Sequence, residues 1–174
     1  MSVLSRLFRP DHTPPPGDAL YRQIVVEARS PDWYTTGAVP DSVDGRFDAV
    51  ALVLALVLIR LEVVGEPARQ FSADLTERFI ADMDGSLREL GIGDPTVGKQ
   101  VGQMVSALGG RLGAYRDALA GVAGGEDLDA ALVRNLYRGA NVEVTAVDWA
   151  ARRVRALAAR FAGVAWPDLR AGSL

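Results

Sequence analysis

The chain has 174 residues, of which 49% are hydrophobic and 24% are charged, a balance typical of one soluble globular domain. It contains no cysteine and a single histidine, which excludes disulfides, thiol catalysis, zinc–cysteine sites and any triad or metal site built on several histidines. The formal net charge of −3 gives no general attraction to nucleic acid, so we expect no direct nucleic-acid partner. We also expect no cofactor.

The N-terminal segment, residues 1–17, is predicted to be a flexible tail because the prolines at 14–16 interrupt it. A second prediction stays open, in which its start forms a short amphipathic turn on an anionic membrane surface. That prediction depends on apolar residues at helical spacing beside two arginines, namely Leu4, Leu7 and Phe8 with Arg6 and Arg9. The expected location is therefore the cytoplasm, with or without peripheral contact at the inner membrane.

Residues 18–29 are predicted to form the first helix, which ends before Pro31. Residues 31–44 follow as a loop with prolines, a glycine and two aromatic side chains, Trp33 and Tyr34.

The helix predicted over residues 45–64 is apolar almost all round, as expected of a central element. Its uncharged run, Ala49 to Ile59, lies between Asp48 and Arg60. Because a membrane-spanning helix needs about 20 apolar residues, this run predicts a buried core helix instead.

Pro67 fits the first turn of the next helix, which is predicted to extend to about residue 90 and to end at Gly91. Asp82 lies near the border of its apolar stripe, where we expect an ion pair with Arg78. The stripe itself recurs every fourth position, at Phe71, Leu75, Phe79, Met83 and Leu87.

Residues 93–99 spell G-x-x-x-x-G-K, one residue short of a phosphate-binding P-loop. A P-loop needs a preceding strand and a serine or threonine after the lysine, whereas a predicted helix precedes these glycines and Gln100 follows Lys99. Asp94 and Pro95 instead start a helix, so nucleotide binding is not predicted.

That helix, residues 95–120, carries two stripes at about 100° per residue. Its glycine stripe leaves two predictions open: a close helix crossing inside the chain, or a shallow groove that receives a helix from a partner. The apolar stripe contains Val97, Val101, Met104, Val105, Leu108, Leu112, Tyr115 and Leu119, and the glycine stripe contains Gly98, Gly102, Ser106, Gly109 and Gly113.

Two further helices are predicted over residues 126–138 and 144–162. Since no strand-like alternation is present, we predict an all-α fold, a single compact bundle of about six helices. The helical domain is expected over residues 18–166, followed by a C-terminal tail over residues 167–174.

Trp149 does not share the buried face of its helix and is expected to project near Arg153 and Arg160. It is predicted either to be an interface hot spot or to stack on a neighbouring arginine or loop. Residues 149–174 carry five arginines and one aspartate, whereas residues 66–94 carry seven acids and three arginines. Opposed charge of this kind helps to orient a charged partner.

No catalytic constellation is recognisable, because the serines have no histidine base and no nucleophile-elbow pattern. We therefore predict a binding protein and not an enzyme. The competing class is a helical protein or enzyme that holds a small molecule, such as a lipid or cofactor, in an apolar pocket between helices.

Three stretches go beyond a general helical pattern. They are the run from Phe47-Asp48 through LVLALVLIRL, the series FIADMD, LRELG, VGK, GGR and AY between residues 79 and 115, and AALVRNLY at residues 130–137. Together they resemble the ubiquinol–cytochrome c chaperone family, in its alphaproteobacterial branch, over about residues 19–138. The loop from Trp33-Tyr34 to Pro40-Asp41 fits as well. Val133 stands where the mitochondrial pattern usually has tryptophan, and lysine is nearly absent.

The resemblance implies an all-helical, non-catalytic assembly factor that helps newly made cytochrome b mature into the bc1 complex. It also implies a second assembly factor or the ribosome as further partners. The partner-binding residues predicted from the surface pattern and from the resemblance are Trp33, Tyr34, Asp82, Arg88, Lys99, Gly102, Gly109, Arg111, Tyr115 and Trp149.

Overall fold

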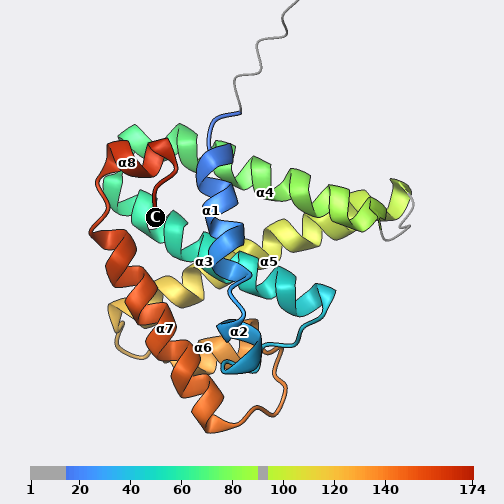
Figure 1. Ribbon diagram of the computed structural model, residues 1–174, viewed down its shortest axis with the longest axis vertical. Coiled ribbons are helices and arrows are strands. Elements are labelled where there is room, and N and C mark those ends of the chain that lie inside the picture. The colour runs from blue at the N-terminus through green and yellow to red at the C-terminus, as the bar shows by residue number, and fades with distance from the viewer. Residues whose placement is uncertain (1–14, 90–93) are drawn as a thin grey trace, which may run out of the picture.

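The computed structural model describes residues 15–89 and 94–174, and every regular element in these ranges is a helix, which confirms the all-α prediction (Figure 1). The elements are α1 (Asp18–Ala28), α2 (Asp32–Thr35), α3 (Val43–Val64), the 3₁₀ helix η2 (Glu66–Ala68), α4 (Arg69–Glu89), α5 (Asp94–Ala120), α6 (Leu128–Asn135), α7 (Val144–Ala162) and α8 (Trp166–Ala171).

Helix α3 is the centre of the fold. Ser42 caps its start, because the side-chain oxygen accepts a hydrogen bond from the Gly45 amide at 3.1 Å. Every residue from Phe47 to Leu58 is buried, as the prediction of a core helix requires. None of the helices in the described ranges is long and apolar enough to cross a membrane.

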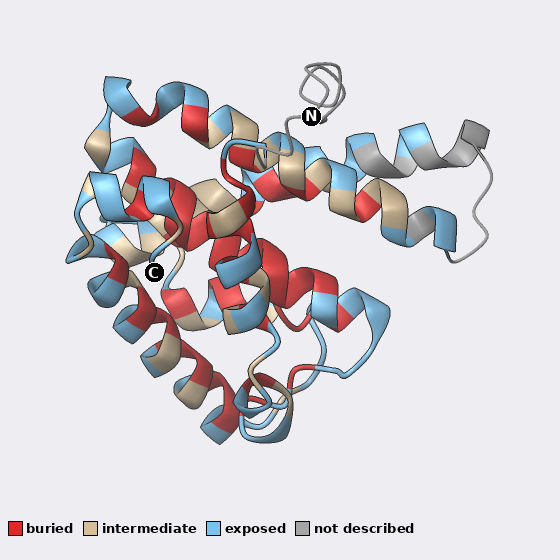
Figure 2. Ribbon diagram, turned by 45° about the horizontal axis from the view of Figure 1, so that its top comes forward, coloured by how far each residue is buried: buried red, intermediate tan, exposed pale blue. Residues whose placement is uncertain are grey.

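The other helices are arranged around α3. Helices α1, α4, α5 and α7 contact α3 directly, and α6 lies between α5 and α7. Burial follows the same arrangement, since the buried residues are concentrated along α3 and on the sides of the other helices that face neighbouring helices (Figure 2).

Helices α4 and α5 form an antiparallel hairpin whose far half extends beyond the rest of the molecule (Figure 2). Within that half, Met104 is half-buried and Val105 is 37% exposed, whereas Leu108 and Tyr115 nearer the body are buried. The bundle expected from the sequence therefore carries one projection, the far half of this hairpin.

Two short helices stand where the sequence predicts irregular chain. Pro31 precedes α2 inside the expected loop, and α8 occupies most of the expected C-terminal tail. Helix α8 is not a tail, because Leu169 is fully buried and Trp166 packs edge-on against Phe71 with ring centroids 5.4 Å apart. The predicted membrane-touching turn at Leu4 lies outside the described residues.

Candidate functional site

Two aromatic residues of the predicted partner surface, Trp33 and half-buried Trp149, pack against each other. Trp33 is fully buried and meets Trp149 edge-to-face, with ring centroids 5.4 Å apart and an interplanar angle of 89°. Gly37 allows this contact, since a Cβ added there would lie 2.7 Å from Cζ3 of Trp149. Trp149 therefore stacks on the loop and not on an arginine, and Trp33 is not an exposed binding residue. Half-buried Tyr34 donates its hydroxyl proton to the Ala28 carbonyl at 2.9 Å.

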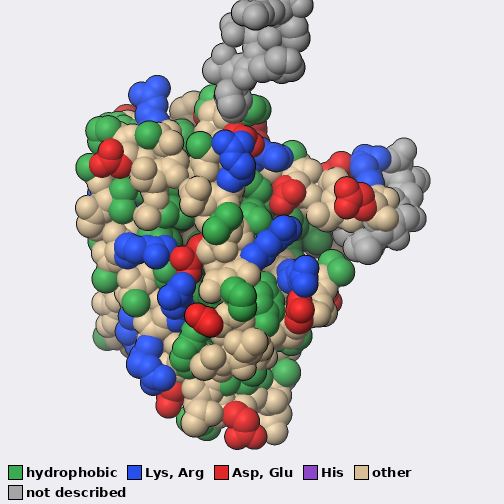
Figure 3. Space-filling model, viewed as in Figure 1, with side chains coloured by type: hydrophobic (Ala, Val, Ile, Leu, Met, Phe, Trp, Pro, Cys, Tyr) green, Lys and Arg blue, Asp and Glu red, His purple; other side chains and the backbone are tan. Residues whose placement is uncertain are grey.

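The arginines expected beside Trp149 have another partner. Arg153 and Arg160 of α7 both pair with Glu27 of α1, with N···O distances of 2.5 and 2.9 Å. Arg152 and Arg155 are exposed on the same helix, and basic side chains are visible along α7 (Figure 3). The basic C-terminal region predicted from the sequence thus divides into a structural part bound to Glu27 and a solvent-facing part.

A buried carboxylate organises the other end of the bundle. The Asp48 side chain has no exposed surface and accepts bonds from Arg111 Nη2 and Arg138 Nε, both at 2.5 Å. The Arg111 guanidinium also lies over the Phe47 ring, 5.3 Å from its centroid. Arg111 therefore holds α5 against α3, and its binding role stays a prediction from the resemblance for a side chain that is buried here.

Tyr115 is fully buried one turn after Arg111, so it is not a surface binding residue either. Its hydroxyl oxygen has no hydrogen-bond partner among the described residues. Tyr137, in contrast, donates its hydroxyl proton to the Gly37 carbonyl at 2.6 Å. Burial raises the pKa of Tyr115 above its usual range and raises the pKa of Tyr137 to about 12.

This contrast yields a matched pair of variants. Tyr137→Phe is expected to lower the free energy of unfolding by about 0.5–1.5 kcal/mol, because a made hydrogen bond is lost. Tyr115→Phe is expected to leave it equal or slightly higher, since the phenol loses no protein partner among the described residues. Urea unfolding of both variants checks this, and a larger loss for Tyr115→Phe would contradict the packing described.

Asp82 ties two helices together instead of facing a partner. It accepts a hydrogen bond from the Tyr21 hydroxyl of α1 at 2.8 Å. Arg78, predicted to pair with Asp82, instead pairs with Asp18 at 2.9 Å. The predicted ion pair is therefore wrong. Arg78 pairs with a carboxylate on the neighbouring helix α1, and the sequence pattern of α4 alone does not reveal that contact. Burial, followed by the bond to Asp82, raises the pKa of Tyr21 above its usual range.

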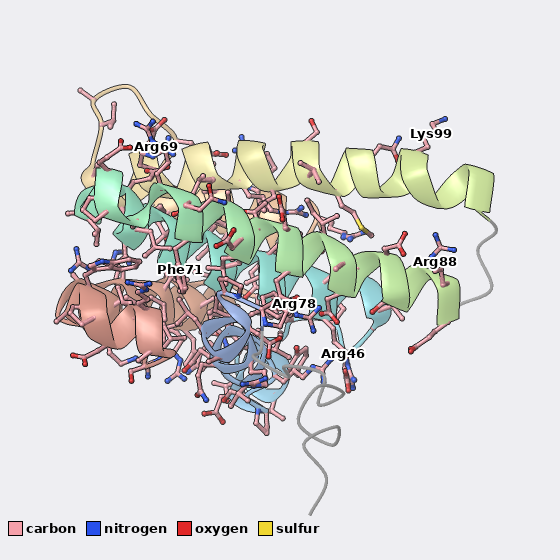
Figure 4. The ribbon with its side chains drawn as sticks, turned by 90° about the horizontal axis from the view of Figure 1, so that it is seen from above. Arg46, Arg69, Phe71, Arg78, Arg88 and Lys99 are labelled. Atoms are coloured by element: carbon pink, nitrogen blue, oxygen red, sulfur yellow. The ribbon has the colours of Figure 1, made fainter. Side chains whose placement is uncertain are left out.

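The remaining charged residues of the prediction lie near the far end of the hairpin (Figure 4). Arg88 pairs with Asp84 one turn earlier on α4, with an N···O distance of 2.7 Å. Lys99 is exposed in the second turn of α5. These two residues are therefore accessible to a partner.

The glycine stripe of α5 faces open space. A Cβ added to Gly98, Gly102, Gly109 or Gly113 would meet no heavy atom within 4 Å, outside the helix's own nearby backbone. The prediction of a close helix crossing within the chain is therefore wrong for these glycines. The alternative, a face available to a partner, is the one that the geometry leaves open.

Gly102→Ala is accordingly expected to stabilise the protein. The position is exposed in a helix interior, where glycine costs roughly 0.5–1 kcal/mol relative to alanine, and the added methyl group has room. Thermal unfolding should show the gain. A destabilised variant would mean that the α5 face contacts another part of the chain in solution.

A groove of about 410 Å³ lies between α3, α4 and α5, and we call it the α3–α4–α5 groove. Its apolar surface comes mainly from Leu58, Ala73 and Leu112. At one end Arg116 of α5 clamps Glu62 of α3 with two bonds of 2.6 and 2.8 Å. Sequence reasoning did not identify this groove, although Ser72, Ala73 and Thr76 are small residues that leave room on α4.

Other hollows on the described surface offer little to a small molecule. One of about 790 Å³ lies between α1, α4 and α8, and like the α3–α4–α5 groove it is open to solvent. An enclosed cavity with convergent polar groups, which a small-molecule site would favour, is not among these grooves. The described residues also contain no group of three side chains suited to hold a metal ion.

Comparison with known proteins agrees with this fold. Residues 35–174 match the family model described as ubiquinol-cytochrome C chaperone. Among solved structures, the chain is similar to the Cbp3 homolog from Brucella abortus, with 31% identity over 90% of this chain and 85% of that chain and a TM-score of 0.77. Curated proteins give no match. Since the family model covers most of the chain and the relative shares both sequence and fold, this chain belongs to the ubiquinol–cytochrome c chaperone family.

Proposed function

We propose that this chain is a non-catalytic assembly chaperone for the bc1 complex, and that its client is newly made cytochrome b. Family membership supports the first part of the proposal, because the family's description is ubiquinol-cytochrome C chaperone. In this proposal the chain acts on the cytoplasmic side of the inner membrane, where cytochrome b emerges before it is assembled.

The observation that carries the client assignment is the open face of the α4–α5 hairpin. There, the α3–α4–α5 groove presents apolar side chains, and α5 continues with glycines that nothing in the described chain covers. A protein that holds an immature membrane segment needs such a surface, since apolar helices bind by inserting side chains into a groove or by close backbone approach.

The test is genetic and biochemical. In a bacterium whose own gene for this protein is deleted, bc1 content measured by haem spectra of membranes should fall, and the full chain should restore it. Affinity purification of the tagged chain from membranes should bring down cytochrome b. Wild-type bc1 content in the deletion strain would refute the proposed function.

A further inference from the structure

The α3–α4–α5 groove combines an apolar floor with an acidic rim. Leu58, Ala73 and Leu112 supply the floor, and the charged residues that line the groove are both acids, Glu62 and Glu77. Glu62 is already paired with Arg116, so its charge is largely compensated. Glu77 forms no ion pair with any described basic side chain and is exposed on α4.

The size and neighbourhood of the groove indicate how an occupant lies. A volume of about 410 Å³ suits a few large side chains of a helix and not a whole helix. Along α5, Gly109 and Val105 stand three and seven positions before Leu112, so they share its side of the helix. Because Gly109 has open space above it and Val105 is 37% exposed, a helix seated in the groove can continue along this side of α5.

The charge around the groove favours one kind of flanking sequence on the bound helix. Glu77 is exposed on α4 at the groove, and residues 66–94 carry seven acids against three arginines. A basic segment of the occupant is attracted to this surface, whereas an acidic one is repelled. In membrane proteins the cytoplasmic ends of apolar helices are enriched in lysine and arginine.

We infer that the α3–α4–α5 groove binds an apolar helical segment of the client through side chains one turn apart, with the segment's basic flank beside Glu77. This inference rests on the proposed function, because the flanks that a chaperone meets on the cytoplasmic side are enriched in lysine and arginine. It adds where on the chaperone the client segment binds and which charge on the client is favoured there.

Binding of labelled synthetic helices to the purified full chain tests the inference. The probe is a peptide of about 20 leucine and alanine residues with three lysines at one end, held in mild non-ionic detergent. The control peptide carries three glutamates in place of the lysines. Fluorescence anisotropy is expected to show binding of the lysine peptide, with weaker binding of the glutamate peptide.

Two variants of α4 probe floor and rim separately. Ala73→Trp fills the groove and is expected to weaken binding of both peptides at least tenfold, since the anchoring side chains lose their site. Glu77→Lys leaves the floor intact and is expected to remove the preference for the lysine peptide, a change of about threefold to tenfold in the affinity ratio. Glu77 is exposed, so this second variant reports on binding even where Ala73→Trp folds poorly.

Matched controls make the same chemical changes elsewhere. Ala156→Trp places the same bulk at an exposed position of α7, and Asp168→Lys makes the same charge change on α8. Both should bind like the wild type. Absent binding of the lysine peptide, equal affinity for the two peptides, or a loss caused by Ala156→Trp in place of Ala73→Trp would overturn the inference.

The outcomes separate this inference from the proposed function. If cytochrome b co-purifies with the chain and bc1 content depends on it, but Ala73→Trp binds peptides normally, the groove assignment falls and the function stands. If the peptides bind as expected while the deletion strain keeps wild-type bc1 content, the groove stands and the proposed client falls.

Discussion

Replacing Asp48 with asparagine is expected to lower the free energy of unfolding by about 3–5 kcal/mol, because it leaves the buried Arg111 cation without its counter-charge. The Asp48 carboxylate is fully buried and both of its oxygens are engaged, one by Arg111 and the other by Arg138. Asparagine keeps the shape of the side chain but removes the charge and replaces one acceptor oxygen with an NH2 donor, so the loss reports the missing charge together with one lost hydrogen bond. Urea unfolding followed by circular dichroism measures it.

Glu62→Gln is the matched control for Asp48→Asn. Glu62 also accepts two bonds from one arginine, Arg116, but both side chains of this pair are over 40% exposed. An exposed pair contributes at most about 1 kcal/mol, since water screens the charges and solvates the partner that remains. Equal losses of unfolding free energy in the two variants would show that burial does not strengthen the stabilising effect of the Asp48 ion pairs.

Trp33→Ala is expected to destabilise the protein by a similar amount, about 3–5 kcal/mol, by opening a cavity in the core. Trp33 has no exposed surface, and its removal also takes away the edge-to-face partner of Trp149. The melting temperature and the urea midpoint should both fall. This result would establish Trp33 as a core residue and not a contact residue for a client.

Tyr34→Phe separates the two aromatic residues of the same loop. It removes only the hydroxyl that donates to Ala28, so a loss of about 0.5–1.5 kcal/mol is expected. A stable Trp33→Ala variant that nevertheless fails to support bc1 assembly would contradict the assignment, because it would restore Trp33 as a binding residue.

The long helices were predictable because their signals are local. Apolar periodicity, together with breaks at Gly65 and at the Gly124-Gly125 pair, is contained in stretches of twenty or so residues, and α3 follows directly from its uncharged run. The short helices α2 and α8 were not predicted, because each contains too few residues to show an apolar periodicity. Helix α8 is held largely by tertiary contacts of Leu169 and Trp166.

The site was harder to predict because its contacts join residues distant in the chain. Asp48 meets Arg111 and Arg138 across 63 and 90 positions, and Asp82 meets Tyr21 across 61. Sequence spacing places these side chains on helix faces but does not say which face meets which. For the same reason, the sequence did not decide between the two predictions for the glycine stripe. The groove could not be predicted either, because three helices form it together.

Site-specific photocrosslinking in cells tests the central claim most directly. A photoreactive amino acid in place of Ala73, in the groove, is expected to form an adduct with newly made cytochrome b, whereas the same amino acid in place of Asp168, on α8, is expected to form none. Pulse-labelled membranes and an antibody to cytochrome b identify the adduct. Absence of cytochrome b from the Ala73 adducts, in cells that are actively assembling the bc1 complex, would contradict the account.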